Sequence, residues 1–190
     1  ADTTYYDMIH KDCQKDEAAD FRVKKYQLDF SVGLNLTGSA KVYVDRSELK
    51  SYRFTLYHGY KVKQVTDQTG AALDFRREHD YVTVTRGGAA VEYLCLEYTG
   101  KSPKYYSSYA GVCLPANFAY YPIPGYRELF SDNFYGFIDC SLPYDTAFDV
   151  RCSGRKQMYC NLAARGDNHF AGNARSITLL SGYYDTLKLN

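Results

Sequence analysis

The sequence contains no tryptophan, and no apolar run in it approaches the roughly 18 consecutive residues that a membrane-spanning helix needs. It also lacks an excess of either charge, since 23 basic residues are matched by 22 acidic ones without long runs of one sign. A protein that binds nucleic acid or an anionic membrane surface carries a basic stripe or patch. The sequence therefore predicts no membrane-spanning helix in this chain and excludes nucleic acid as an expected partner.

Signatures of the common enzyme classes are absent as well. The chain has no H-E-x-x-H, no G-x-S-x-G, no glycine-rich phosphate loop and no EF-hand calcium loop. His58 follows an expected strand and His79 falls in an expected turn, so we interpret both as polar residues at strand ends. We expect no catalytic residue, no metal ligand and no cofactor, and therefore no enzymatic activity. A carboxylate pair brought together only by the fold is the remaining route to hydrolysis.

The six cysteines form no C-x-x-C motif. Their even number permits disulfides, but the spacing does not select a connectivity. Cys152 and Cys160 flank a turn and can meet across a hairpin, which makes them the candidate disulfide, although a register shift of one residue would put them on opposite faces. Cys95 lies inside an expected strand, where we expect a free buried thiol.

Aromatic residues are abundant, with 21 tyrosines and 10 phenylalanines. In residues 26–32, Tyr26, Leu28, Phe30 and Val32 alternate with polar residues, which is typical of a half-buried strand. Alternation, β-branched residues and glycine-containing turns predict further strands over residues 40–45, 52–57, 60–66, 72–77, 81–86, 91–98, 136–140, 146–152 and 157–162, and a hairpin of 176–180 and 183–189 around Ser181-Gly182.

Three regions stand apart from this pattern. Residues 1–20 carry apolar side chains at spacings of three to four and predict a short amphipathic helix or connector arm. The strand over residues 91–98 is apolar on both faces, so we expect it in the middle of a sheet and covered on each side. Residues 99–133 lose all periodicity and are rich in glycine, proline, serine and aromatics. We predict an all-β domain over residues 21–190, an antiparallel β-sandwich or saddle-like pair of twisted sheets with this long aromatic-rich loop.

The long loop is the best candidate for a binding surface. Long irregular segments in compact domains are commonly functional, and tyrosine suits binding faces because it is apolar along its body and polar at its tip. The expected ligand or partner surface consists of Tyr105, Tyr106, Tyr109, Asn117, Phe118, Tyr120, Tyr121 and Tyr126. A peptide or a glycan would suit such a platform.

Several short segments resemble a known family in both type and order. They are Tyr-Gln-Leu-Asp-Phe at 26–30, Gly-Ser-Ala-Lys-Val at 38–42, Phe-Thr-Leu-Tyr-His at 54–58, Val-Thr-Asp-Gln-Thr-Gly at 65–70 and Leu-Glu-Tyr-Thr-Gly at 96–100. Over residues 21–190 the chain is similar to the N-terminal, saddle-shaped β domain of aminopeptidase N-like zinc peptidases, the gluzincins. The tract Phe-Ala-Tyr-Tyr-Pro-Ile-Pro-Gly at 118–125 resembles most closely the aminopeptidase-like extracytoplasmic region of bacterial ABC-type permeases.

The zinc helix and the peptidase domain of the gluzincins are missing, so the resemblance transfers no catalytic residue. It implies a non-catalytic, extracytoplasmic β module, tethered to a membrane in its full-length protein, that packs on or binds other domains of the same polypeptide or a membrane complex. It also places Asn117 and Phe118 where the peptidases have residues near the substrate cleft. The alternative is a stand-alone carbohydrate- or peptide-binding β-sandwich that uses the tyrosine-rich loop.

Overall fold

The computed structural model describes residues 17–127 and 140–183, and these residues form strands and connections without a helix. The predicted all-β class is therefore confirmed. No helix in this part of the chain is long and apolar enough to cross a membrane. The expected N-terminal helix and the strands expected over 136–140 and 183–189 lie almost wholly outside the described residues.

The strands are β1 (Val23–Val32), β2 (Asn35–Val44), β3 (Ser51–Thr55), β4 (Tyr60–Thr66), β5 (Phe75–Glu78), β6 (Tyr81–Thr85), β7 (Tyr93–Lys101), β8 (Gly111–Leu114), β9 (Ile123–Pro124), β10 (Thr146–Ser153), β11 (Gln157–Cys160), β12 (Ala163–Gly166), β13 (His169–Ala174) and β14 (Leu179–Gly182).

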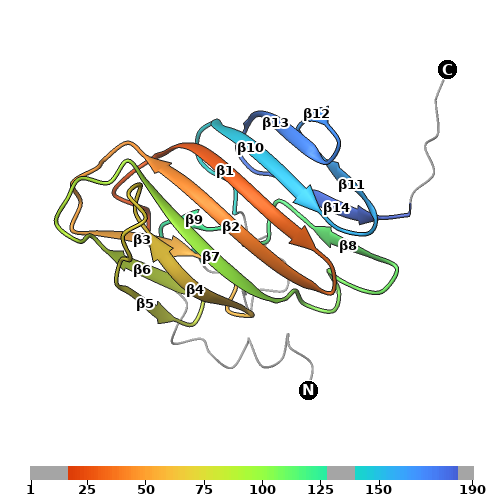
Figure 1. Ribbon diagram of the computed structural model, residues 1–190, viewed down its shortest axis with the longest axis horizontal. Helices are drawn as coiled ribbons and strands as arrows, with labels where there is room; N and C mark the ends of the chain where they lie inside the picture. The colour runs from red at the N-terminus through yellow and green to blue at the C-terminus, as the bar shows by residue number, and fades with distance from the viewer. Residues whose placement is uncertain (1–16, 128–139, 184–190) are drawn as a thin grey trace.

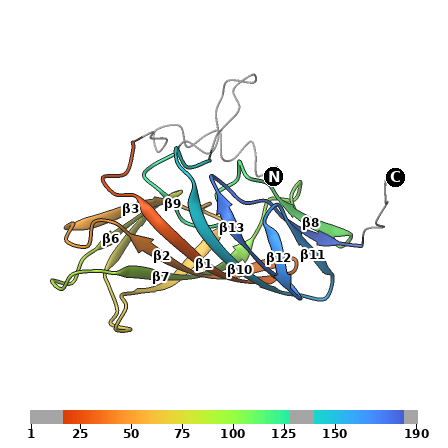
Figure 2. The ribbon, with the colours of Figure 1, turned by 90° about the horizontal axis from the view of Figure 1, so that it is seen from above.

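The strands form three sheets. The largest has seven strands in the order β12-β13-β10-β1-β2-β7-β4, and the smaller ones have the orders β5-β6-β3-β9 and β11-β14-β8. Figure 1 shows the seven-stranded sheet crossing the molecule, with β3, β5 and β6 at one end and β8, β11 and β14 at the other. In Figure 2 this sheet is a curved layer, and both smaller sheets lie on one side of it. The core fills the space between them.

Strand β1 lies in the middle of the large sheet, between β2 and β10. Its pairing with β10 is parallel and all the other strand pairings are antiparallel. Tyr26, Leu28, Phe30 and Val32 are all buried, as the alternation predicts. One face of β1 therefore covers the core and the other is the outer face of the sheet.

Strand β7 corrects one expectation. It lies between β2 and β4, so its interior position in the sheet is confirmed. Leu94, Leu96 and Tyr98 are buried, but Tyr93 and Cys95 on the opposite face are only half-buried. The second face is not covered by a layer; Tyr93 instead packs against the Tyr43 ring of the neighbouring strand and under Lys41.

Two boundaries also differ from the prediction. The Ser181-Gly182 pair was expected to form a turn, but β14 runs through it and pairs with β11 on one side and β8 on the other. The irregular stretch expected over residues 99–133 is interrupted by the end of β7, by β8 and by the short β9. In both places the pairing partner is distant in the chain, and local turn propensity gives no sign of it.

The connection from Pro115 to Gly125 runs through the core, and tyrosine hydroxyls hydrogen-bond to its backbone. Tyr26 donates to the carbonyl of Pro122 over 2.8 Å and Tyr98 donates to that of Tyr120 over 2.9 Å. Tyr120 in turn donates to the carbonyl of Ile177 over 2.9 Å. A buried irregular backbone must find partners for its carbonyls, and these phenols supply them.

Candidate functional site

The eight residues of the predicted binding surface do not form one surface in the structure, because some are buried and others are exposed. Phe118, Tyr120 and Tyr121 are buried, with at most 4% of their surface exposed. They cannot contact a ligand, so their assignment to the binding surface was wrong. Tyr106 and Tyr126 are half-buried, while Asn117, Tyr105 and Tyr109 are exposed. The reason is that the buried rings are needed to fill the space between the sheets: Tyr121 packs edge-on against Tyr26, which stacks on Phe148 at 5.0 Å.

The exposed tyrosines lie in the connection before β8 and directly after β14. Both strands belong to the sheet at one end of the molecule in Figure 1. In the described residues the large apolar side chains that remain exposed are Leu34, Tyr105, Tyr109 and Tyr183, at 45%, 55%, 87% and 81%. Leu34 and Tyr109 line a hollow of about 590 Å³, and Tyr105 and Tyr183 line an adjoining one of about 350 Å³. Ser108 and Val112 line both hollows. We call this surface the tyrosine groove.

The rim of the tyrosine groove is basic. Arg155 and Lys156 line the larger hollow and Lys104 lines the smaller one, and no described residue that lines either is acidic. Lys156 donates a hydrogen bond to the carbonyl of Tyr109, and its Nζ lies 5.3 Å from the ring centroid of Tyr183. The groove therefore offers aromatic rings and positive charge together, on loops held by β8, β11 and β14.

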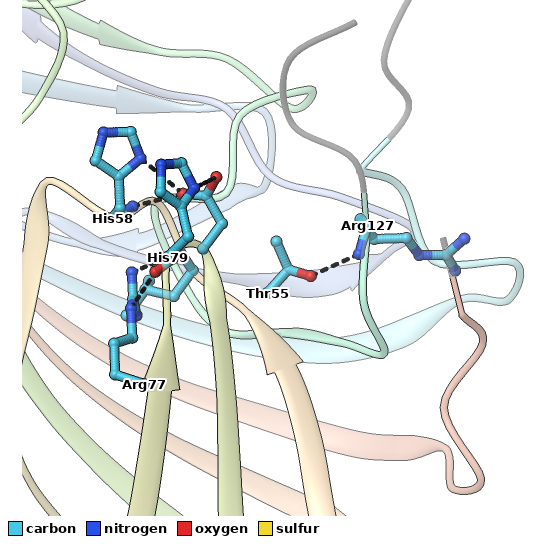
Figure 3. Close-up of polar contacts among 7 residues, drawn as sticks. Thr55, His58, Arg77, His79 and Arg127 are labelled. Atoms are coloured by element: carbon cyan, nitrogen blue, oxygen red, sulfur yellow. Dashed lines mark hydrogen bonds and ion pairs between the residues drawn. The ribbon is translucent and has the colours of Figure 1, made fainter. Parts of the chain in front are cut away.

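A second site lies at the other end of the fold, and sequence reasoning missed it. The register of β3 with β6 pairs Thr55 with Tyr81, so residues just after β3 meet the two-residue loop between β5 and β6. His58 Nδ1 lies 3.0 Å from one carboxylate oxygen of Asp80, and His79 Nδ1 lies 2.9 Å from the other. Figure 3 shows both imidazoles directed at this carboxylate. We call these three residues the His-Asp cluster.

Asp80 is the buried centre of the His-Asp cluster, and 5% of its surface is exposed. The backbone N–H of His58 also donates to the Asp80 carboxylate over 2.6 Å. The backbone carbonyl of Asp80 accepts a hydrogen bond from the N–H of Leu56. Burial alone would raise the pKa of this carboxyl, but the hydrogen bonds and charges of the two histidines outweigh it and lower the pKa to about 2. Asp80 is therefore ionised throughout the neutral range.

Arg77 and Thr55 fix the backbone around the cluster. Arg77 donates to the carbonyls of His79 and Leu56, and its burial lowers its pKa to about 10. Thr55 donates to the carbonyl of Gly125 over 2.9 Å and accepts the N–H of Arg127 over 2.7 Å. In Figure 3 the Arg127 side chain extends away from the histidines. The cluster thus consists of His58, His79 and Asp80, and Arg77 supports its backbone.

The sequence contained only a partial signal of this cluster. His58 at a strand end and His79 in a turn were both placed correctly, and the hairpin over residues 72–86 was expected. What was missing was the β3–β6 register, which brings positions 22 residues apart into contact. Asp80, in turn, looked like an ordinary turn residue.

The candidate disulfide is open in the structure, where Cys152 and Cys160 are separate thiols. Burial, with a smaller contribution from the neighbouring Cys160, raises the pKa of Cys152 to about 12. Cys95 is also a free thiol, half-buried where full burial was expected.

No protein-family model and no curated protein matches this chain in sequence. Its fold is nevertheless similar to solved structures of M1 zinc metallopeptidases. A mutant of the enzyme from Deinococcus radiodurans bound to a Tyr-Ser-Ala substrate superposes with a TM-score of 0.59 at 15% identity, covering 90% of this chain and 44% of that one. Yeast leukotriene A4 hydrolase in complex with bestatin gives 0.59 at 14%, covering 86% of this chain and 29% of that one. The chain spans less than half the length of these enzymes, and at this identity the likeness concerns the fold.

Proposed function

We propose that this chain is a non-catalytic β domain of a larger aminopeptidase-like protein and that it contacts another domain of that protein through the tyrosine groove. One observation carries the proposal: the chain shares its fold with M1 metallopeptidases over most of its own length but spans less than half of theirs. Its 190 residues contain no H-E-x-x-H motif. A helix with this motif supplies two histidine ligands for a catalytic zinc ion and the glutamate that acts as general base.

The tyrosine groove is the surface best suited to that contact. Protein interfaces are enriched in tyrosine and arginine at their centres, and a few such side chains supply most of the binding energy. Tyr109 and Tyr183 stand almost fully exposed beside Arg155 and Lys156. Because the described lining is basic and aromatic, the complementary segment is an acidic one with apolar side chains.

Two measurements test this proposal. The isolated chain, assayed with aminoacyl anilide substrates in the presence of zinc, is expected to show no hydrolysis above the buffer blank. The rest of the protein encoded by the same reading frame, expressed separately, is expected to bind the chain. Tyr109→Ala and Lys156→Glu should each weaken that binding at least tenfold, whereas Lys63→Glu, on an exposed residue of β4 away from the groove, should not.

The contrary outcomes are equally definite. A reading frame that encodes no further domain, or hydrolysis by the chain itself, would remove the proposal. The proposal would also fail if the groove bound a free glycan or peptide selectively and the chain had no affinity for the rest of its protein. That result would support the stand-alone binding sandwich.

The resemblance of the Phe118–Gly125 tract supports a finer proposal, that the domain lies outside the cytoplasm and is tethered to a membrane in a permease-like protein. Much of this tract fills the core, so its composition also has a purely structural reason. Cys113 lines the tyrosine groove and is covered there if the groove is an interface, so a cysteine introduced at Lys63, an exposed residue of β4 outside the groove, provides the reporter. In intact cells that express the full-length protein, a membrane-impermeant maleimide is expected to label the Lys63→Cys variant more strongly than the unmodified protein. Labelling that appears only after lysis would contradict the extracytoplasmic location.

A further inference from the structure

The His-Asp cluster has the composition and spacing of a metal site. The ligand atoms of His58, His79 and Asp80 all lie within 4.8 Å of one another. Both Nδ1 atoms face the same carboxylate, one at each oxygen. We propose that these three residues bind one divalent transition-metal ion through the two Nδ1 atoms and the Asp80 carboxylate.

The donor set selects the class of ion. Two imidazole nitrogens and a carboxylate suit Zn²⁺, Co²⁺, Ni²⁺ and Cu²⁺, whereas Ca²⁺ and Mg²⁺ prefer oxygen ligands. Three protein ligands leave a fourth position for water, the arrangement of an open zinc site. The side chains of His58 and His79 are 20% and 18% exposed, so the ion has a route to the cluster.

Binding requires the ligand atoms to draw closer together. At metal–ligand distances of about 2.0–2.2 Å, tetrahedral ligand atoms lie about 3.3–3.6 Å apart. The Nδ1–oxygen separations of 3.0 and 2.9 Å are shorter than this, because protons bridge them. The whole ligand set spans up to 4.8 Å, so its widest pair must close by roughly 1 Å when the ion binds. The ion replaces these protons, and each imidazole then carries its proton on Nε2.

The surrounding backbone already holds the ligands in place. The His58 N–H fixes one oxygen of Asp80, and Arg77 ties the carbonyls of Leu56 and His79 together. The Arg77 charge opposes a dication, although its hydrogen bonds go to carbonyl oxygens and not to the carboxylate. We therefore expect moderate affinity, with Asp80 supplying the charge that makes binding favourable.

Cobalt titration of the chain without an affinity tag tests the site. The expected result is saturable binding of one Co²⁺ per chain, with the visible absorption of a four-coordinate ion and no near-ultraviolet thiolate band, and its displacement by Zn²⁺. His58→Gln and His79→Asn should each lower the affinity at least tenfold. Asparagine is chosen because His79 has φ 51°, a conformation that asparagine tolerates.

The chain contains a matched control. His169 Nε2 lies 3.0 Å from Asp149, so His169→Asn removes a histidine with the same kind of carboxylate contact and should leave cobalt binding unchanged. Circular dichroism verifies that each variant is folded. If His79→Asn is not folded, the result for His58→Gln decides. Absent binding, a thiolate band, or undiminished binding by His58→Gln would each overturn the proposal.

Discussion

The hydroxyl of Tyr98, on strand β7, donates a 2.9 Å hydrogen bond to the carbonyl of Tyr120 in the connection that crosses the core. Both residues are buried, at 1% and 0% exposed. This contact shows why the chain is rich in tyrosine: the same side chain fills the core and satisfies the backbone of an irregular segment within it.

Tyr98→Phe should therefore destabilise the fold by about 1–3 kcal/mol, because it leaves the Tyr120 carbonyl without this donor in the core. Tyr109→Phe is the matched control, since that side chain is 87% exposed. Chemical denaturation of both variants makes the comparison. Equal stability of Tyr98→Phe and the unmodified chain would show that the hydroxyl is dispensable.

Gly38 lies opposite Tyr98 on β2, and the tyrosine ring occupies the space where a Cβ would be. A Cβ on Gly38 would come within 2.5 Å of Tyr98 Cζ, whereas one on Gly166 would meet nothing within 4 Å. Gly38→Ala should cost about 1–3 kcal/mol by overpacking, and Gly166→Ala should cost much less. The two free energies of unfolding give the test, and a similar cost at both positions would contradict this account.

Thr55 is completely buried and bridges Gly125 and Arg127 through its hydroxyl. Thr55→Val preserves the shape of the side chain but leaves a buried carbonyl and an N–H without this partner, so it should cost about 1–3 kcal/mol. Thr55→Ser retains the hydroxyl and should cost less. If the valine variant were the more stable of the two, packing and not hydrogen bonding would be decisive here.

Alkaline pH should unfold the protein. Burial raises the pKa of Tyr26, Tyr98 and Tyr120 well above the ordinary value, so the folded state retains protons that the unfolded chain loses near pH 10. The unfolded state then binds fewer protons, and the stability present below pH 10 is lost as pH rises further. Phenolate absorbance should show one phase from exposed tyrosines and a later one that coincides with loss of circular dichroism. A single reversible phase with the fold intact would contradict the burial of these hydroxyls.

Much of the fold follows from local pattern. Alternation over residues 26–32 predicted β1 because burial on one sheet face has a period of two residues. The same reasoning placed His79 in a turn but could not place His58 beside Asp80, because that contact depends on the register of β3 with β6. The orientation of Tyr120 and Tyr121 was equally inaccessible, since an aperiodic segment does not reveal which rings point inward. Of the eight residues of the predicted surface, Tyr105, Tyr106 and Tyr109 line the proposed groove and the other five do not.

Hydrogen exchange measured on this chain alone and within its full-length protein tests the central claim most directly. The account predicts that amides of residues 104–113 and 154–156, around the tyrosine groove, exchange more slowly in the full-length protein, while the outer face of β7 and β4 is unchanged. Identical exchange around the groove in both forms would contradict it.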